Sequence, residues 1–413
     1  MLGRRDFLTA AAGAGASLAM TGGAVAQQVT HMPSRSEGPF PRGLPSPEWV
    51  RYPEPNVRAL DPRFNKYMVG NTYIERLWTG AMWAEGPVWF GDVGLLIFSD
   101  IPNNRILKYD EQSGQVSVLR EPSSYTNGNT RDRDGRLLSC EQDRRSVVRT
   151  EHDGKLTLVA GTFEGKKLNG PNDIVVASDR TIWFTDPGYG LGTYYESNHQ
   201  TGEELPRAVY RVDPKSGKME VVTKDHTRPN GLAFSPDEKK LYVCDTGITD
   251  GPDKPTDITA YDVGDDGKLS NRKTLFDLKK EVPAMEQMAL NRPRNQPMMA
   301  GGTTPGGATM PSSGGTTPPG TDQGPEGGFF KYGIADGIRL DTDGNIWAGT
   351  GWGGPVIDGV TAIAPDGTPI GRIFMPEVVA NVAFGGAKRN RLFMAGSTSL
   401  YAVYVNVAGA APA

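Results

Sequence analysis

The side chains best suited to chemistry in this sequence are carboxylates and amides that stand beside glycine or proline. Four of them recur in such contexts, namely Glu85, Asn172, Asn230 and Asp336. Carboxylate and amide oxygens can bind hard cations, but next to glycine or proline the same residue types commonly support turns. Taken singly, each of the four is better explained as a loop or turn residue. Any chemistry therefore depends on whether the fold brings them together.

Other short motifs resemble known signatures but fit β-turns better. The glycines at 349–354 match G-x-G-x-x-G, yet no helical pattern follows them, which argues against nucleotide binding. Residues 132–135 and 341–344 resemble pieces of a calcium-binding loop, but their glycine comes too early and the distal Glu is missing. The four histidines form no zinc-binding pattern, and for His226 a surface role is favoured over a place near a central channel. No G-x-S-x-G elbow is present, which weakens a serine-esterase interpretation.

The sequence has two cysteines, Cys140 and Cys244, and each lies in a predicted strand. Their separation rules out a C-x-x-C metal site. Buried thiols are favoured over a disulfide bond.

The elements that must position the candidate side chains are short and joined by many turns. The chain has 413 residues, of which 53 are glycine and 32 proline, while 37% are hydrophobic. This composition predicts a folded, turn-rich protein with a sizeable core. The formal net charge of −4 lacks the basic footprint of a nucleic-acid binder or of a protein that binds anionic membranes.

Residues 1–26 have the organisation of an export signal. Arg4-Arg5 precede a charge-free stretch of small residues that ends in an A-x-A site at residues 24–26. The paired arginines resemble a twin-arginine signal, which implies the Tat export machinery as a partner and a periplasmic or secreted mature protein. No later stretch reaches the ~20 apolar residues of a membrane span. We therefore expect no membrane association after cleavage.

One phrase repeats along the chain: a turn, a β-branched strand that ends in a small or polar pair, a second strand, and a third. The first strand ends at residues 99–100, 140–141, 185–186, 244–245, 350–351 and 395–396. Most spacings are roughly 40–60 residues, as four-stranded propeller blades require, and one gap is about 100 residues. Six such all-β units predict a closed propeller rather than a sandwich.

Two irregular stretches flank or interrupt this repeat. Residues 27–71 form a Pro-rich arm before the first blade, and residues 281–328 are rich in Gly, Pro and Met without an aromatic residue. The second stretch predicts a flexible insertion into the propeller domain at 72–406. Linker or surface roles are favoured over a lid for both, and residues 407–413 are expected to be a short tail.

Several phrases together resemble the SMP-30/gluconolactonase/luciferin-regenerating-enzyme-like family. They occupy residues 85–89, 98–102, 169–173, 183–187, 228–237, 241–245, 335–341 and 344–347. The resemblance runs from about residue 72 to 406, in the family's order. It implies a six-bladed β-propeller with a central metal site, in agreement with the repeat count.

The resemblance also implies one divalent cation in the central channel, with Glu85, Asn172, Asn230 and Asp336 at the matching ligand positions. Two carboxylates and two amides form a hard, all-oxygen set, which favours Ca²⁺, with Mg²⁺, Mn²⁺ and Zn²⁺ as alternatives. Calcium takes 6–8 oxygens, so four protein ligands leave positions for water and substrate.

The implied activity is hydrolysis of a small-molecule lactone derived from a sugar, as in gluconolactonase. The cation would polarise the lactone carbonyl, and Asp336 would activate the attacking water as general base. Direct nucleophilic attack by Asp336 is the competing role, and the sequence leaves both open.

The substrate walls are predicted from two further sets of residues. Polar candidates that match a stretch of bacterial gluconolactonase-like members are Asn127, Asn129 and Glu141. Aromatic candidates for stacking on a sugar ring are Tyr125, Tyr189 and Trp352. Turn and packing roles remain equally open for them. Animal members carry Arg where this chain has Gly170, so their polyol contact cannot be assumed.

Two alternatives to a sugar lactonase remain at this point. One is a promiscuous hydrolase of lactones, aryl esters or phosphotriesters. The other is a non-catalytic propeller that binds a sugar or a protein and keeps the metal for structure. The two carboxylates, Glu85 and Asp336, favour an enzyme, because a binding module does not need an open, charge-balanced ion site.

Overall fold

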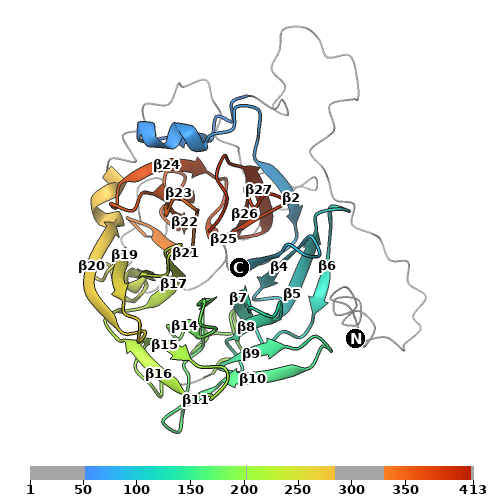
Figure 1. The fold of residues 1–413 in the computed structure, drawn as a ribbon, viewed down its shortest axis with the longest axis vertical. Helices are drawn as coiled ribbons and strands as arrows, with labels where there is room; N and C mark the ends of the chain where they lie inside the picture. Colours follow the sequence, from blue (N-terminus) through green and yellow to red (C-terminus); the bar gives the residue numbers. More distant parts are fainter. Residues whose placement is uncertain (1–51, 201, 284–329, 411–413) are drawn as a thin grey trace, which may run out of the picture.

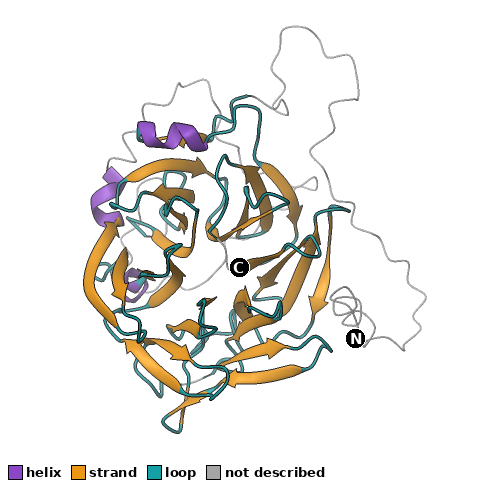
Figure 2. Cartoon of the chain, in the orientation of Figure 1, coloured by secondary structure: helices purple, strands orange, loops and turns teal. Residues whose placement is uncertain are grey.

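The computed structural model describes residues 52–200, 202–283 and 330–410. It forms six antiparallel sheets arranged as blades around a central axis (Figure 1). Strands make up nearly all of the regular structure, as Figure 2 shows. The predicted six-bladed propeller is therefore confirmed. The export signal at 1–26 and most of the insertion at 281–328 lie outside the described residues.

Blades 1 to 3 follow one another along the chain. Blade 1 contains β3 (Ala84–Phe90), β4 (Leu95–Asp100), β5 (Arg105–Asp110) and β6 (Gln115–Arg120). Blade 2 contains β7 (Thr126–Arg131), β8 (Leu137–Glu141), β9 (Ser146–Thr150) and β10 (Leu156–Ala160). Blade 3 contains β13 (Ile174–Val176), β14 (Ile182–Asp186), β15 (Ala208–Val212) and β16 (Met219–Thr223). A small hairpin of β11 (Thr162–Phe163) and β12 (Lys166–Lys167) separates blades 2 and 3 in the sequence.

Blades 4 to 6 complete the ring. Blade 4 contains β17 (Pro229–Phe234), β18 (Lys240–Asp245), β19 (Asp257–Val263) and β20 (Leu269–Asp277). Blade 5 contains β21 (Ile334–Leu340), β22 (Ile346–Gly351), β23 (Gly359–Ile363) and β24 (Pro369–Phe374). Blade 6 contains β25 (Val379–Gly385), β26 (Arg391–Gly396) and β27 (Ser399–Tyr404). A short 3₁₀ turn, η2 (Gly247–Asp250), follows β18, and a helix begins at residue 278 after β20.

The N-terminal part of the propeller closes the ring. Strand β2 (Glu75–Thr79) pairs with β27 as the outer strand of blade 6. Before it, β1 (Val57–Ala59) adds a fifth strand to blade 5 by pairing with β24. The 3₁₀ helix η1 (Pro62–Tyr67) then buries Phe64 and Tyr67 beside Trp347. The later part of the predicted arm is therefore ordered and packs against blades 5 and 6.

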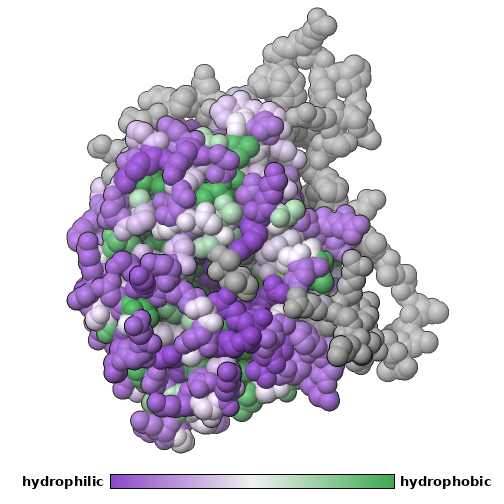
Figure 3. Space-filling view, in the orientation of Figure 1, coloured by the Kyte–Doolittle hydropathy of each residue, from purple (hydrophilic) through white to green (hydrophobic). Residues whose placement is uncertain are grey.

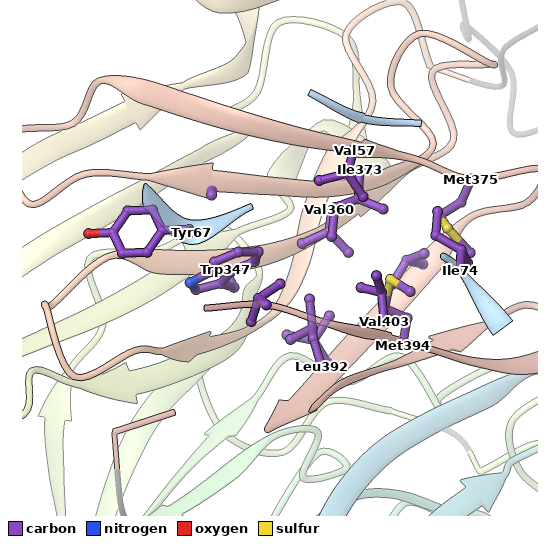
Figure 4. Packing of buried hydrophobic residues seen from close by; sticks show 14 of the residues in the cluster. Val57, Tyr67, Ile74, Trp347, Val360, Ile373, Met375, Leu392, Met394 and Val403 are labelled. Atoms are coloured by element: carbon purple, nitrogen blue, oxygen red, sulfur yellow. The ribbon is translucent and has the colours of Figure 1, made fainter. Parts of the chain in front are cut away.

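Each blade interface has its own hydrophobic core. The cluster between blades 5 and 6 packs Trp347 and Val360 against Leu392 and Val403 (Figure 4). Five further clusters fill the other interfaces in the same way. The apolar, β-branched and aromatic runs of the strands face these interfaces, which is why they form sheet. Hydrophilic residues dominate the face that Figure 3 displays.

The predicted first strand of the repeat is the second strand of each blade. Its six predicted ends coincide with the last residues of β4, β8, β14, β18, β22 and β26. A further strand precedes it in every blade, and these preceding strands contact one another in ring order around the axis. They are the innermost strands β3, β7, β13, β17, β21 and β25. The repeat pattern missed them because five of the six contain glycine and several also contain proline or asparagine, while β13 has only three residues.

A β-bulge interrupts five of the six innermost strands near the centre. In β3, for example, Glu85 pairs with Ser99 and Val88 pairs with Ile97, so β3 carries one extra residue. The same irregularity occurs in β7, β17, β21 and β25. A bulge re-aims the side chains beside it. Four of these bulges fall at polar residues singled out from the sequence, and the bulge in β25 falls at Asn381, which was not.

The smaller motifs and the cysteines match their turn and core interpretations. The Asp132 and Asp341 side chains accept hydrogen bonds from backbone N–H groups of the turns that follow them. Gly349 and Gly351 lie in strand β22, with no helix after them. Cys140 and Cys244 are buried and unpaired. In the described ranges, no helix is long and apolar enough to cross a membrane.

Candidate metal centre and active site

The six innermost strands each bring a polar residue to the ring at the same end of the propeller. Their members are Glu85, Asn127, Asn172, Asn230, Asp336 and Asn381. Five lie at the second or third position of their strand, and Asn172 lies just before β13. All six are at most 8% exposed. The structure therefore gathers the four predicted ligands with two further amides.

The glycines beside these residues allow neighbouring innermost strands to approach closely. A Cβ on Gly86 would lie 2.2 Å from the Asn127 carbonyl oxygen, and one on Gly231 would lie 2.1 Å from that of Asp336. Gly128 stands in the same relation to Asn172 at 2.3 Å. Gly86, Gly128 and Gly231 lie within strands at positions where only hydrogen fits.

The two carboxylates of the ring are buried and electrostatically strained. Burial raises the pKa of Glu85 well above its usual value, and the negative charges of Asp336 and Asp173 raise it further. Burial likewise raises the pKa of Asp336, with contributions from Asp173 and Glu196. Glu85 accepts hydrogen bonds from the Asn381 amide at 3.2 Å and from the Gly86 N–H. Clustered carboxylates of this kind favour a bound cation, since a cation would offset their repulsion.

The chemistry of the ring fits a hard divalent cation. All donors are carboxylate or amide oxygens, which suit Ca²⁺ or Mg²⁺ better than softer metals. The Asn127 side-chain oxygen is buried and accepts no hydrogen bond from the described residues. No group of three or more His, Cys, Asp or Glu side chains is placed to hold a metal in the described ranges. A cation here would therefore depend on amide oxygens beside the two carboxylates.

A second set of carboxylates fixes the backbone that leads into the ring. Asp100, Asp186 and Asp245 end the second strands of blades 1, 3 and 4, and all are buried. Asp186 accepts hydrogen bonds from the N–H groups of Asn169 and Gly170, shortly before Asn172. Asp100 holds residues 82–83 before Glu85, and Asp245 holds residues 227–228 before Asn230. The polar pairs that defined the sequence repeat thus position the candidate ligands.

An ion pair between the buried Asp173 and the partly buried Arg339 links blades 3 and 5. The Arg339 guanidinium donates to both oxygens of Asp173, at 3.1 and 3.3 Å. Asp173 also accepts a hydrogen bond from the Leu232 N–H of blade 4 at 3.4 Å. Asp173 directly follows the candidate ligand Asn172, and Arg339 lies three residues after the candidate ligand Asp336. The ion pair connects three blades beneath the ring and neutralises a third carboxylate.

Sequence reasoning missed three of these residues. Asp173 and Arg339 lie within the matched phrases 169–173 and 335–341 but were not singled out, and Asn381 lies outside all of the phrases. The signal that could have found Asn381 is positional, because it occupies the place in blade 6 that Asp336 occupies in blade 5.

The Asn129 and Glu141 side chains bind other protein groups. The Asn129 amide donates to Gly86 O at 3.1 Å and to Ser99 Oγ at 2.8 Å, and its oxygen accepts from Ser139. Glu141 forms ion pairs with Arg120 and Arg144, each at 2.9 Å. Both side chains are almost completely buried. Their polar atoms are therefore engaged with neighbouring strands and arginines, and their place on the substrate wall stays a prediction.

The aromatic candidates have distinct positions. The Tyr189 hydroxyl hydrogen-bonds Thr246 Oγ1 at 2.5 Å, and the Asn230 amide donates to that same oxygen at 3.4 Å. Trp352 stacks on Trp83, with ring centroids 5.2 Å apart. The Tyr125 hydroxyl donates to Asn198 at 3.3 Å. Tyr189 is therefore linked to a candidate ligand through the Thr246 hydroxyl, whereas Trp352 and Tyr125 contact loop residues.

His226 lies neither on the surface nor in the ring. It is 6% exposed and packs against Tyr261, with ring centroids 5.7 Å apart. Burial lowers its pKa to about 4. The expectation of a surface role is therefore wrong, because the segment between β16 and β17 folds inward.

The geometry can now be compared with known proteins. The chain matches the model of the SMP-30/Gluconolactonase/LRE-like region over residues 83–398. It is 26% identical over 369 residues to a gluconolactonase of Zymomonas mobilis, a match that covers 86% of this chain and 87% of the relative.

Two solved structures give the same picture. A gluconolactonase from Xanthomonas campestris is 29% identical with a TM-score of 0.65, and the match covers 84% of this chain and 94% of the other. A putative gluconolactonase is 30% identical with the same TM-score of 0.65, at coverages of 86% and 99%. The chain therefore belongs to the SMP-30/gluconolactonase/LRE-like family, as its motifs predicted.

Proposed function

We propose that this protein opens the ring of a sugar-derived lactone by water attack, with a divalent cation held by the ring of innermost-strand residues. The enzyme class follows from the family and from relatives named gluconolactonase: the chain is a lactone hydrolase. The observation that carries the finer proposal is the buried pair of carboxylates, Glu85 and Asp336, amid amide oxygens that converge from separate blades.

Glu85, Asn172, Asn230 and Asp336 would hold the cation, and the orphaned Asn127 oxygen stands beside them as a further acceptor. A bound Ca²⁺ would supply Lewis-acid polarisation of the lactone carbonyl and would balance the two carboxylates. Magnesium, manganese or zinc could serve in the same place.

Asp336 is the proposed catalytic residue. As general base, its carboxylate would take a proton from the water that attacks the lactone carbonyl carbon. The ring C–O bond then breaks, and the proton passes to the ring oxygen to give the hydroxy acid. The Asn230 side chain, which hydrogen-bonds Asp336, would keep the carboxylate oriented for this transfer. Direct nucleophilic attack by Asp336 is the alternative, and it would give a covalent acyl intermediate.

The N-terminal sequence extends the proposal to the compartment. Arg4-Arg5 and the A-x-A site at residues 24–26 support export through the twin-arginine machinery to the periplasm or the exterior. Such substrates fold before transport, so the cation site would form before export.

A substrate panel tests the proposal. Purified protein would be assayed by pH-stat on glucono-δ-lactone, phenyl acetate and a dialkyl aryl phosphotriester, each with and without Ca²⁺. We expect acid release from the sugar lactone to exceed that from the other two by more than tenfold. Hydrolysis of the phosphotriester alone would instead favour the promiscuous hydrolase. Absence of hydrolysis together with Ca²⁺ binding would favour a non-catalytic propeller.

A further inference from the structure

A cavity of about 260 Å³ lies between blades 2 and 3, at the end of the propeller opposite the ring. Its walls include the turn between β7 and β8, the turn between β13 and β14, and the turn between β15 and β16. Asn127 lies near the start of β7 and Asn172 just before β13, whereas the first two turns follow the ends of these strands. The cavity is therefore separate from the candidate metal centre.

Cationic side chains outnumber carboxylates in the wall of this cavity. The lining contains two carboxylates and five cations, the latter being Arg133, Arg136, Arg149, Arg180 and Lys215. Val176 and Ile182, both buried, form part of the same wall. An apolar surface excludes water and lowers the effective dielectric constant, which strengthens the attraction between these cations and an anion. The wall therefore has the composition of an anion site.

Two shared carboxylates hold three of these arginines in a chain of ion pairs. Asp134 accepts hydrogen bonds from Arg136 Nη2 and from Arg180 Nη1, both at 2.9 Å. Glu151 accepts from Arg136 Nη1 at 3.1 Å and from Arg149 Nε at 2.8 Å. The guanidinium groups are therefore fixed before any ligand arrives, which lowers the conformational entropy that binding would cost.

Lys215 supplies the surplus positive charge of the cavity. The four arginines form salt bridges with an equal number of carboxylates, namely Asp132, Asp134, Glu151 and Glu238. In the part of the chain that the structure describes, the Lys215 ammonium forms no salt bridge. The nearby Asp213 carboxylate instead accepts hydrogen bonds from the Lys215 backbone N–H at 2.8 Å and from the Ser216 hydroxyl at 2.9 Å. An anion in the cavity would balance the charge of Lys215.

Arg180 combines a strained backbone with unused hydrogen-bond donors. Its φ of 75° lies in the left-handed region, which residues other than glycine rarely adopt. The Arg180 N–H donates to Ala177 O at 2.9 Å, which closes this turn. Within the described ranges the guanidinium uses only Nη1, which donates to Asp134, so Nε and Nη2 remain available as a pair of parallel donors. Backbone strain of this kind is commonly kept where it positions a side chain for function.

We propose that this cavity binds a small oxyanion of the phosphate class, held by Lys215 and Arg180. The free edge of the Arg180 guanidinium matches two oxygens of a phosphate, and the Lys215 ammonium adds a point charge. The cavity is smaller than the ~300–1,000 Å³ of pockets for drug-sized ligands, which suits an ion of a few atoms.

A second cavity of about 320 Å³ adjoins the first and shares Arg180, Pro214 and Lys215 with it. It leaves room for an organic group, so the phosphoryl group of a small monoester is a second source of the same oxyanion. The site is independent of the lactonase function, because it lies at the other end of the propeller.

Calorimetric titration with sodium phosphate tests the site. The protein is first stripped of cations and dialysed free of chelator, so that no metal in the ring can bind the anion. We expect saturable binding at about pH 8, where phosphate is a dianion, and affinity lower by about tenfold or more in Lys215→Met. Arg180→Lys keeps the charge but removes the paired donors, so it should also bind phosphate more weakly. Absence of saturable binding, or equal affinity in wild type and Lys215→Met, would overturn the site.

Lys155→Met is the matched control. Lys155 is exposed in the turn between β9 and β10 of blade 2, pairs with Asp153 at 2.8 Å and does not line the cavity. This variant should bind phosphate like the wild type, and a loss equal to that of Lys215→Met would overturn the site. Arg180 and Lys215 are exposed as well, so their variants should unfold at the wild-type temperature in the absence of phosphate.

A second titration identifies the source of the oxyanion. Glycerol 3-phosphate that binds more tightly than phosphate would identify a monoester as the ligand, and equal or weaker binding would identify the free ion. Both results support the oxyanion site. Since neither titration involves turnover, phosphate binding by a protein without lactonase activity would support this site and leave the proposed reaction as the part that failed.

Discussion

Gly231 in blade 4 lies directly against the backbone of Asp336 in blade 5: a Cβ at Gly231 would come within 2.1 Å of the Asp336 carbonyl oxygen. Asn230, another candidate ligand, directly precedes this glycine in the sequence. The Asp336 carboxylate is the proposed general base. Close packing of two innermost strands therefore sets the distance between two members of the ring.

Substitution of this glycine should damage both stability and the site. Gly231→Ala forces a backbone shift, because the atom it meets is a carbonyl oxygen and not a flexible side chain. We expect a loss of about 2 kcal/mol or more in the free energy of unfolding. The control is Gly70→Ala, since nothing lies within 4 Å of a Cβ there. Denaturant unfolding of the two variants would contradict this packing role if both lost the same small amount.

Neutralising Asp336 should stabilise the protein when no cation is present. Its pKa is raised by burial and by neighbouring carboxylates, so its ionised form is costly in the folded state at high pH. At pH 8 in chelator, Asp336→Asn is expected to unfold at a higher temperature than the wild type, by an equivalent of about 1–2 kcal/mol. Added Ca²⁺ should then raise the Tm of the wild type and leave the variant nearly unchanged. A lower Tm for the variant in chelator would contradict the electrostatic account.

The ion pair beneath the ring should show strong coupling. Arg339→Met leaves the buried Asp173 without its cation, and we expect a cost of about 3–5 kcal/mol. The double variant Asp173→Asn/Arg339→Met removes both charges and should be more stable than Arg339→Met alone. A double-mutant cycle from urea unfolding measures this coupling. Additive losses would mean that the two side chains do not stabilise each other.

His226 should make the protein sensitive to acid. Burial lowers its pKa from 6.5 to about 4, so the unfolded chain binds a proton that the folded protein rejects over this window. This contribution to stability is complete above about pH 6.5 and falls as the pH drops toward 4, by at most roughly 3 kcal/mol. His226→Phe keeps an aromatic ring against Tyr261 without the titration. Unfolding at pH 7 and pH 4.5 should show a smaller loss for the variant, and equal losses would contradict the assignment.

The blades could be predicted from the sequence because their second strands repeat a local pattern. Ser99-Asp100 and Thr185-Asp186, for example, each end an apolar run that forms a single strand. The innermost strands escaped this pattern, since Gly86 and Gly231 look like turn residues until the neighbouring blade is in place. Their requirement for glycine arises from tertiary contact, and local propensity does not report it.

The candidate site could likewise be predicted only in part from the sequence. Glu85, Asn172, Asn230 and Asp336 were predicted because each belongs to a family phrase. Asn381 and the Asp173–Arg339 pair required the closed ring, because their partners lie in other blades. Asn129 and Glu141 also have partners in blade 1. A sequence match cannot show such contacts, so it assigned both residues to the substrate wall.

The most direct test of the account is base consumption by the purified wild-type protein on glucono-δ-lactone in a pH-stat. The protein would be stripped with chelator and then supplied with Ca²⁺, in parallel with Asp336→Asn. The account predicts acid release that disappears in chelator, returns with the cation and is reduced at least about 100-fold in the variant. Equal rates from wild type and Asp336→Asn, with or without the cation, would contradict it.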